Sequence, residues 1–415
     1  MASRYQAPRG TFDVLPADGR ARRRIEATAA GIFARAGYEP ISTPAFEDTE
    51  LFERGVGRST DIVRKEMFTF EDKGGRGITL RPEGTAPICR AYLEHGMHKL
   101  AQPVKLFYAG PFFRHERPQA GRYRQFHQIG VEAIGTDSPL ADAEAIALLA
   151  DLLGELGVPG VRLRLGSLGS PDARSAYIDE LKAHLRAHEG ELSRDVRERI
   201  ELNPLRAFDA GDEGTRGVMA SAPTIVERLE GEDADHFAEV RALLDAAGIA
   251  YEIDPTLVRG LDYYTRTIFS FLCDELGAQS EVGGGGRYDG LIEQLGGPPT
   301  PAVGWATGIE RILLALGEGG EEPTRKVFVS HLPGSATAAR TALVVAGELR
   351  RAGLSVEVDL GRRSVKGQFK HANRIGADVV VVLEEGGIEL RDMESGEQKP
   401  VDAGALVAEI ERMRS

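Results

Sequence analysis

The feature that most constrains the fold is the segment of residues 107–135, which reads FYAGPFFRHERPQAGRYRQFHQIGVEAIG. Its two ends are rich in aromatic and β-branched residues, which favour strands. Between them, RPQAGRY contains the proline and glycine typical of a turn-rich connection. We therefore predict a long β-hairpin that carries arginines, among them Arg114 and Arg122, along one side and Gln128 and Glu132 along the other.

Such a hairpin suits a site that holds a polyphosphate beside a small polar ligand. A guanidinium group presents a planar fork of N–H donors that matches the geometry of phosphate oxygens. The side chains of Gln128 and Glu132 offer further hydrogen-bonding atoms to a second molecule.

The same segment resembles motif 2 of the class II aminoacyl-tRNA synthetases, in the form found in the histidyl-tRNA synthetases. Five further stretches resemble that family, in its order along the chain: RGTFDVLP (9–16), LRPEGTAPICRAY (80–92), LVRGLDYYTRTIF (257–269), GGGGRYDGL (283–291) and VGWATGIERILLAL (303–316). A helix expected near residues 20–36, followed by extended YEPISTPAFEDTELF (38–52), resembles motif 1. Motif 1 builds the dimer interface of the family, so the resemblance implies a homodimer.

The resemblance also implies a two-step reaction on ATP with Mg²⁺, L-histidine and tRNA-His. Histidine would be activated to histidyl-adenylate with release of pyrophosphate, and then transferred to the 3′ end of the tRNA. Neither step needs a protein nucleophile, so catalysis would come from positioning and from cations that stabilise charge on the phosphate. The magnesium would be bound to the substrate, and we predict no protein-bound metal.

Five side chains would serve ATP and catalysis in this family pattern. Arg114 would contact the α-phosphate and the carboxylate region, and Glu116 would lie near the adenine. Arg122 and Arg311 would hold the γ-phosphate. Arg259 resembles the arginine that reaches the α-phosphate where other class II enzymes use a metal ion. Because a guanidinium keeps its charge at any working pH, we expect Arg259, with Arg114, to be catalytic.

Recognition of histidine requires partners for both imidazole nitrogens and for an ammonium group. A site built to hydrogen-bond its ligand rejects analogues that lack those groups, so no editing domain is required. The resemblance assigns Glu132 and Tyr264 to the ring, with Tyr263 beside them, and Glu83, Thr85 and Gln128 to the surroundings of the α-amino group.

Two regions are candidate tRNA contacts. Residues 361–374 read GRRSVKGQFKHANR and contain Arg362, Arg363, Lys366 and Lys370 without one acidic residue. A solvated helix face would also explain this pattern, but the block resembles the family's anticodon-binding domain. Gln119, in the hairpin connection, resembles the residue that meets the extra guanosine at the start of tRNA-His.

The family resemblance and the sequence pattern together predict the domain organisation. We expect a catalytic domain over residues 1–322, with a helical insertion at about 171–248, and an α/β anticodon-binding domain over 325–415. The class II fold implies an α+β catalytic domain with a mainly antiparallel six-stranded sheet flanked by helices. GEGGEEPT (317–324) is a predicted linker. Strands then alternate with helices, which predicts a largely parallel sheet.

Bulk properties indicate a soluble, cytoplasmic protein. Hydrophobic residues make up 42% of the 415 residues, and no apolar run reaches membrane-spanning length. The N-terminus lacks a secretory pattern, and the two cysteines show no metal-ligand spacing. The net charge of −13 argues weakly against a non-specific nucleic-acid binder.

Three other functions fit parts of the pattern. The synthetase-like regulatory subunit of ATP phosphoribosyltransferase shares the catalytic fold, but usually lacks the C-terminal domain and has eroded motifs. A class II synthetase for threonine or proline would lack the LVRGLDYYTRT block. A module that senses uncharged tRNA would be expected to carry an effector domain. The residues present favour the enzyme that activates histidine.

Overall fold

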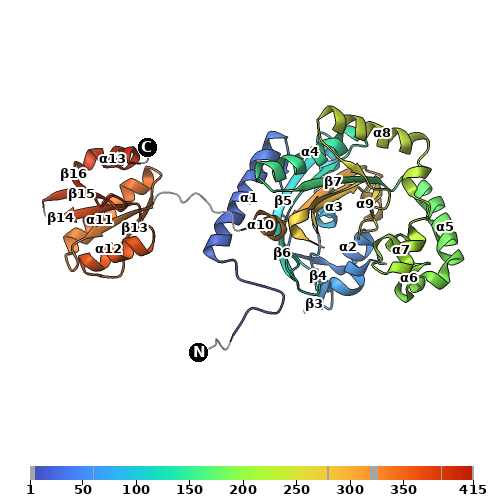
Figure 1. Cartoon of the computed structure of the whole chain (residues 1–415), viewed down its shortest axis with the longest axis horizontal. Coiled ribbons are helices and arrows are strands. Elements are labelled where there is room, and N and C mark those ends of the chain that lie inside the picture. The colour runs from blue at the N-terminus through green and yellow to red at the C-terminus, as the bar shows by residue number, and fades with distance from the viewer. Residues whose placement is uncertain (1–4, 59, 278–279, 318–325, 385, 414–415) are drawn as a thin grey trace. The chain divides into compact units, whose positions relative to one another are not determined.

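The computed structural model describes residues 5–58, 60–277, 280–317, 326–384 and 386–413. The chain divides into two compact units, Met1–Gly319 and Gly320–Ser415 (Figure 1). Each has its own sheet and its own apolar core. The linker expected at 317–324 lies, except for Gly317, outside the described residues.

An eight-stranded sheet forms the centre of the first unit, with the order β1-β5-β6-β11-β10-β9-β7-β8. Its six inner strands are antiparallel: β5 (Val104–Phe113), β6 (Gln125–Ile134), β11 (Ala302–Gly308), β10 (Glu281–Arg287), β9 (Thr265–Cys273) and β7 (Val161–Ser167). The two-residue strands β1 (Glu39–Pro40) and β8 (Glu252–Ile253) extend the edges in parallel. The predicted antiparallel fold is confirmed. The strand count differs because two-residue strands are too short to produce a period-2 pattern.

One face of this sheet packs against helices α1 (Pro16–Arg35), α4 (Pro139–Glu155), α8 (Gly231–Ala246) and α10 (Ile309–Leu316). The ring of Phe33, on α1, lies 5.6 Å from the ring of Trp305 on β11, and both are buried. The opposite face packs against α3 (Thr85–Glu94) and α9 (Leu291–Gln294), with a second apolar cluster around Tyr92 and Leu106. The sheet is therefore covered on both faces, and side chains that alternate along a strand point to different environments.

A small sheet with the order β2-β4-β3 lies beside this core; it consists of β2 (Phe46–Asp48), β4 (Gly77–Leu80) and β3 (Phe68–Glu71). The segment 38–52, expected to be extended, ends in the short helix α2 (Thr49–Phe52). Glu50 in the first turn of this helix forms an ion pair with Arg54 at the helical i,i+4 spacing. This ion pair favours a helix at Thr49–Phe52. The prediction that residues 38–52 are extended is therefore wrong at its C-terminal end.

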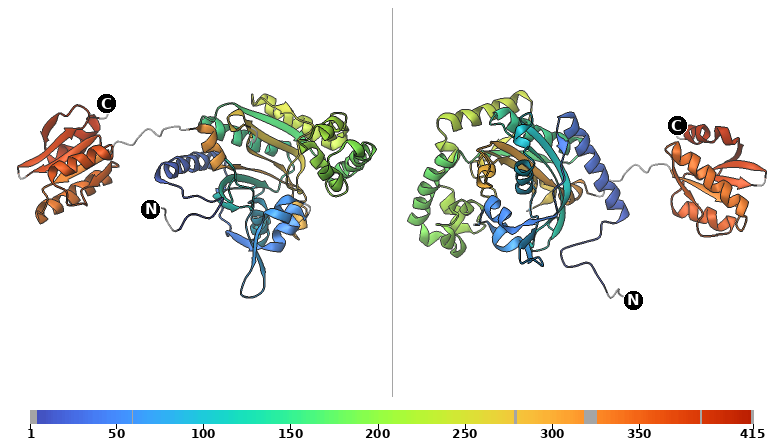
Figure 2. Two further views of the ribbon diagram at one scale, coloured as in Figure 1. Left: turned by 60° about the horizontal axis from the view of Figure 1, so that its bottom comes forward. Right: turned by 180° about the vertical axis from the view of Figure 1, so that it is seen from behind.

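The segment predicted to be a helical insertion, which lies wholly within the described residues, contains helices and no strands. Every element between residues 171 and 246, all of which the structure describes, is a helix or a 3₁₀ turn; the α-helices are α5 (Pro171–Ala187), α6 (Arg194–Arg199), α7 (Glu213–Met219) and α8. Ser170 accepts a hydrogen bond from the amide of Ala173 and caps α5, which begins with Pro171. Figures 1 and 2 show α5 to α7 gathered at the end of the unit away from α1.

The second unit is an α/β domain with a mixed five-stranded sheet of order β13-β12-β14-β15-β16. Its elements are β12 (Lys326–His331), α11 (Ala336–Arg351), β13 (Ser355–Val358), α12 (Val365–Arg374), β14 (Val379–Glu384), β15 (Gly387–Asp392), β16 (Gln398–Val401) and α13 (Leu406–Arg412). Strands β13, β12 and β14 are parallel, but β15 and β16 pair antiparallel. The predicted parallel content of the sheet was therefore too high: β15 begins at Gly387, only three residues after β14 ends at Glu384, which leaves no room for a crossover helix. In the described part of the chain, no helix is long and apolar enough to cross a membrane.

Candidate active site

The predicted hairpin is formed by β5 and β6, which pair from Val104 opposite Ile134 to Phe113 opposite Gln125. Val131 packs into the core on the α1 and α4 face. Because side chains alternate along a strand, Gln128 and Glu132 point to the opposite face, toward α3. The arginines of the connection, Arg114 and Arg122, lie at the turn end of the hairpin, beyond Phe113 and before Gln125.

A cavity of about 370 Å³ opens between this connection and strands β10 and β11. It is lined by all four residues predicted to bind ATP: Arg114, Glu116, Arg122 and Arg311. The Glu116 carboxylate lies 3.4 Å from Nη1 of Arg122 and 3.8 Å from Nη1 of Arg114. Arg311 lies in the first turn of α10, and the positive end of that helix favours an anion in the same place.

Arg114 is held by two further contacts. Its Nε donates a hydrogen bond to the carbonyl of Pro82 at 2.8 Å, and its guanidinium lies 5.3 Å from the centre of the Phe126 ring. The Arg114 guanidinium is therefore fixed at the wall of the cavity.

A smaller cavity of about 120 Å³ adjoins the first. Its lining includes Glu83, Thr85, Gln128, Arg259, Tyr263 and Tyr264. The two cavities share Arg114, Gln128, Glu281 and Ala306. A phosphate in the larger cavity and a small molecule in the smaller one would therefore meet at a common wall.

The smaller cavity presents polar atoms suited to an ammonium group. Glu83 accepts hydrogen bonds from the amides of Thr85 at 2.7 Å and Ala86 at 3.0 Å, at the start of α3. Burial raises the pKa of Glu83, although these amides oppose the shift. The Oε1 atom of Gln128 is buried and has no hydrogen-bond partner among the residues that the structure describes. A ligand donor would satisfy that oxygen, and an unsatisfied one costs free energy.

Glu132 lies behind the residues that line the smaller cavity. It is fully buried and does not line the cavity; one carboxylate oxygen accepts from the Thr85 hydroxyl at 2.8 Å, and the other from the hydroxyl of Tyr288. Burial raises the pKa of Glu132 to about 8. Sequence reasoning missed Tyr288, although it belongs to GGGGRYDGL. A buried carboxylate requires hydrogen-bond donors, but the sequence does not show which residue supplies them, because Tyr288 lies far from Glu132 along the chain.

The predicted tyrosine pair forms one side of the smaller cavity. The rings of Tyr263 and Tyr264 are 4.8 Å apart, and both residues are buried. The Arg259 guanidinium lies 5.7 Å from the centre of the Tyr264 ring, and its Nη1 donates to Glu281 at 2.8 Å. The structure therefore brings Arg259 and both tyrosines into one cavity with the residues around Glu83.

A family model described as histidyl-tRNA synthetase matches residues 10–312. The chain belongs to the histidyl-tRNA synthetase family. A second model, described as an anticodon-binding domain, matches residues 326–413 of this family member.

Individual members of the family are similar over the full length. The histidine–tRNA ligase of Thermosynechococcus vestitus is 47% identical over 414 residues, which cover 99% of this chain and 97% of the relative. The histidine–tRNA ligase of Anaeromyxobacter dehalogenans is 49% identical over 408 residues, 97% of this chain and 98% of the relative. The apo histidyl-tRNA synthetase of S. aureus has a TM-score of 0.80 at 37% identity and covers 98% of this chain and 99% of its own.

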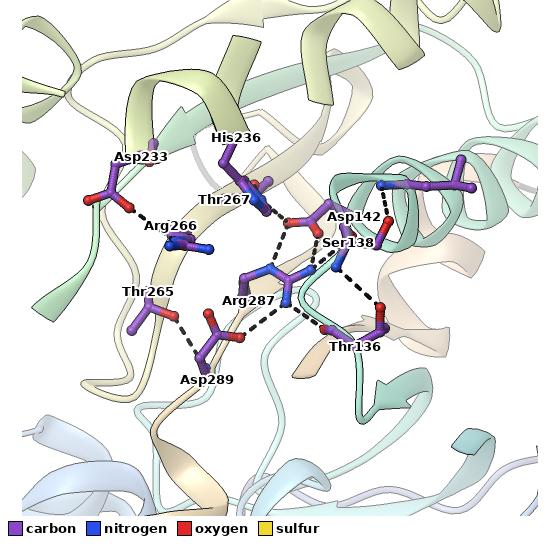
Figure 3. A network of polar contacts seen from close by, with 12 residues as sticks. Thr136, Ser138, Asp142, Asp233, His236, Thr265, Arg266, Thr267, Arg287 and Asp289 are labelled. Carbon is purple, nitrogen blue, oxygen red and sulfur yellow. Dashed lines mark hydrogen bonds and ion pairs between the residues drawn. The ribbon is translucent and has the colours of Figure 1, made fainter. Parts of the chain in front are cut away.

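A buried ionic network, which the family motifs did not predict, fixes the end of β10 (Figure 3). Arg287 is fully buried and pairs with Asp142 of α4 and with Asp289. Nε2 of His236 lies 3.3 Å from the same Asp142 carboxylate. Because Arg287 directly precedes Tyr288, this network orders the strand end that supplies a hydrogen bond to Glu132. The four glycines of the motif lie within β10 itself.

The predicted tRNA contacts lie outside both cavities. Gln119 forms a tight turn with Arg122 through reciprocal backbone hydrogen bonds of 3.2 and 2.9 Å. In the second unit, Arg362, Lys366 and Lys370 are exposed, whereas Arg363 pairs with Asp359. No group of three or more His, Cys, Asp or Glu side chains in the described ranges is placed to hold a metal ion.

Proposed function

We propose that this chain is a histidine–tRNA ligase, which converts ATP, L-histidine and tRNA-His to AMP, diphosphate and L-histidyl-tRNA-His. The observation that carries the proposal is the adjacency of the two cavities. The larger is lined by three arginines, the smaller by carboxyl, amide and phenol groups, and Arg114 and Gln128 belong to both. Family membership supports the same reaction.

In the first step, the histidine carboxylate attacks the α-phosphate of ATP, and pyrophosphate leaves. Arg114, at the wall between the cavities, contacts the α-phosphate and the attacking carboxylate. Arg259 stabilises the charge that grows on the α-phosphate. Arg122 and Arg311 hold the γ-phosphate, and Glu116 lies near the adenine. Mg²⁺ arrives with ATP as part of the substrate.

Histidine occupies the smaller cavity in this proposal. Glu83, Thr85 and Gln128 surround its ammonium group. Tyr264, with Tyr263 beside it, faces the imidazole ring. Glu132 reaches the ring from behind Thr85, provided that one of its hydrogen bonds to Thr85 or Tyr288 is exchanged for the ligand.

The tRNA, the assembly and the compartment complete the proposal. Gln119 contacts the first nucleotide of tRNA-His, and the basic residues of the second unit contact its anticodon region: Arg362, Arg363, Lys366 and Lys370. The second unit is the anticodon-binding domain, and residues 171–248 are an insertion in the catalytic domain. The segment that resembles motif 1 forms a homodimer interface. The enzyme acts in the cytoplasm.

ATP–pyrophosphate exchange, measured with each of the twenty amino acids in turn, tests the proposal. We expect exchange with histidine alone, since the cavity presents partners for both an ammonium group and an imidazole ring. Exchange only with another amino acid would indicate a different synthetase. Exchange with none would favour a regulatory subunit that has kept the fold.

A further inference from the structure

We infer that Glu281 is a positioning residue for adenylation, which holds the guanidinium groups of Arg259 and Arg311 in place. The inference rests on the function proposed above and adds a residue that the motifs do not assign. Glu281 is the first residue of β10 and lines both cavities.

Glu281 joins two arginines that are distant in sequence. Nη1 of Arg259 donates to Oε2 of Glu281 at 2.8 Å, and the hydroxyl of Ser270 donates to the same oxygen at 3.0 Å. Nε of Arg311 donates to the backbone carbonyl of Glu281. Glu281 therefore orients Arg259 through its side-chain carboxylate and Arg311, on α10, through its backbone carbonyl.

The strand is shaped for this pairing. Leu272 of β9 pairs with Glu281, but the neighbouring Phe271 pairs with Gly283, so β10 contains a bulge between these positions. A bulge re-aims a side chain and is common beside active sites. At Gly284, a Cβ atom would lie 3.0 Å from Nη1 of Arg259. The glycine therefore leaves room for the guanidinium at the place where Glu281 meets it.

The pair is charged and faces the substrate cavities. Surrounding protein opposes ionisation, but the charge and hydrogen bond of Arg259 hold the pKa of Glu281 below its ordinary value. The side chain of Glu281 keeps 46% of its surface exposed because it faces the open cavity. The Glu281 contact uses one of the five guanidinium donors of Arg259, which leaves others for a phosphate. Because Glu281 holds the long Arg259 side chain in place before the substrates bind, that side chain does not have to be ordered during the reaction.

Glu281 could instead contact a substrate directly. Kinetic measurements distinguish this role from the positioning of Arg259. Loss of a positioning contact lowers the rate of the chemical step and leaves substrate binding nearly unchanged. Loss of a ground-state contact raises KM and leaves kcat nearly unchanged.

Single-turnover formation of histidyl-adenylate from histidine and Mg–ATP gives the rate of the chemical step, and steady-state ATP–pyrophosphate exchange gives kcat and KM; measured with the full chain, the two together test the role. We expect Glu281→Ala to lower the adenylation rate by roughly tenfold to a hundredfold, with both KM values nearly unchanged. Glu281→Gln keeps an oxygen acceptor for Arg259 and should recover most of the rate. Ser270→Ala removes the second hydrogen bond to the carboxylate and should lower the rate less. Asp274→Ala, which breaks the exposed ion pair with Arg162, serves as the control and should leave the rate unchanged.

Three results would overturn the positioning role: an unchanged rate in Glu281→Ala, a raised KM with unchanged kcat, or a Gln variant as slow as the Ala variant. Circular dichroism checks that each variant is folded; if Glu281→Ala is not, the Gln and Ser270 variants decide. If the unaltered chain shows no exchange with histidine, the proposed function fails and this inference fails with it. An active chain that tolerates Glu281→Ala would overturn this inference alone.

Discussion

At the scale of single residues, the buried carboxyl of Glu132 makes stability depend on pH. Burial raises its pKa from 4.5 to about 8, so the folded chain keeps a proton there that the unfolded chain releases. Stability should therefore fall as the pH rises from about 5 to about 8, by at most about 1.4 kcal/mol per pH unit for this group.

The variant Glu132→Gln carries no titratable proton at this position and should lose that component of the pH dependence. Its free energy of unfolding relative to the unaltered chain should increase between about pH 5 and pH 8. Urea unfolding across this range measures the difference. Parallel pH profiles for the two proteins would show that Glu132 ionises normally in the folded state.

Gly304 makes room for the same carboxylate. A Cβ atom at Gly304 would lie 1.8 Å from Oε2 of Glu132 and 2.5 Å from the carbonyl of Val131. We expect Gly304→Ala to destabilise the chain by about 1–3 kcal/mol and to raise KM for histidine. Gly217→Ala, in α7 where a Cβ meets no atom within 4 Å, is the control and should be neutral or stabilising. Equal stability and equal KM in the two variants would contradict this account.

At the scale of elements, the N-terminal segment holds the β5–β6 connection. The backbone amide of Arg124 donates to the carbonyl of Gly10 at 2.7 Å, and the ring of Phe12 lies 4.6 Å from that of Tyr123. Tyr123 lines the larger cavity. The stretch RGTFDVLP thus acts on the site through the loop that carries Arg122.

Gly10→Ala tests this connection, because Gly10 has φ +86° and its Cβ would lie 2.8 Å from the Arg124 side chain. A loop displaced by such a contact should raise KM for ATP by roughly tenfold to a hundredfold, with KM for histidine less affected. Gly19→Ala, within α1, provides the control, since its Cβ would meet only Val14 at 3.9 Å. An unchanged KM for ATP in Gly10→Ala would show that the segment does not position the loop.

Elements with a strong local pattern were predictable, and contacts between distant elements were not. The β5–β6 hairpin follows from its strand-forming ends and turn residues, and α1 and α4 follow from their helical spacing. The period of two also places Gln128 and Glu132 on one face. Tyr288 and Glu281 act on residues far away in the sequence, so no local pattern reveals them. β15 and β16 are short and polar, and periodicity gave no signal for them.

At the scale of the whole molecule, the two units have separate apolar cores. The described core residues of the second unit form apolar clusters of their own. A chain that ends at residue 319 should therefore fold and keep histidine-dependent pyrophosphate exchange. Its aminoacylation of tRNA-His should fall by roughly a hundredfold or more, the gain that a second linked binding module can provide. Aminoacylation at the full rate would contradict an RNA-binding role for the second unit, and lost exchange would contradict the independence of the first.

We propose that fixed positive charge at the meeting point of the two cavities activates histidine. Pre-steady-state adenylate formation by Arg259→His tests it most directly, with ATP binding measured in parallel. We predict a rate lower by roughly 10²–10³-fold, with ATP binding little changed, because the lost guanidinium acts on charge that develops during the reaction. Adenylation by Arg259→His at the rate of the unaltered chain would contradict the claim.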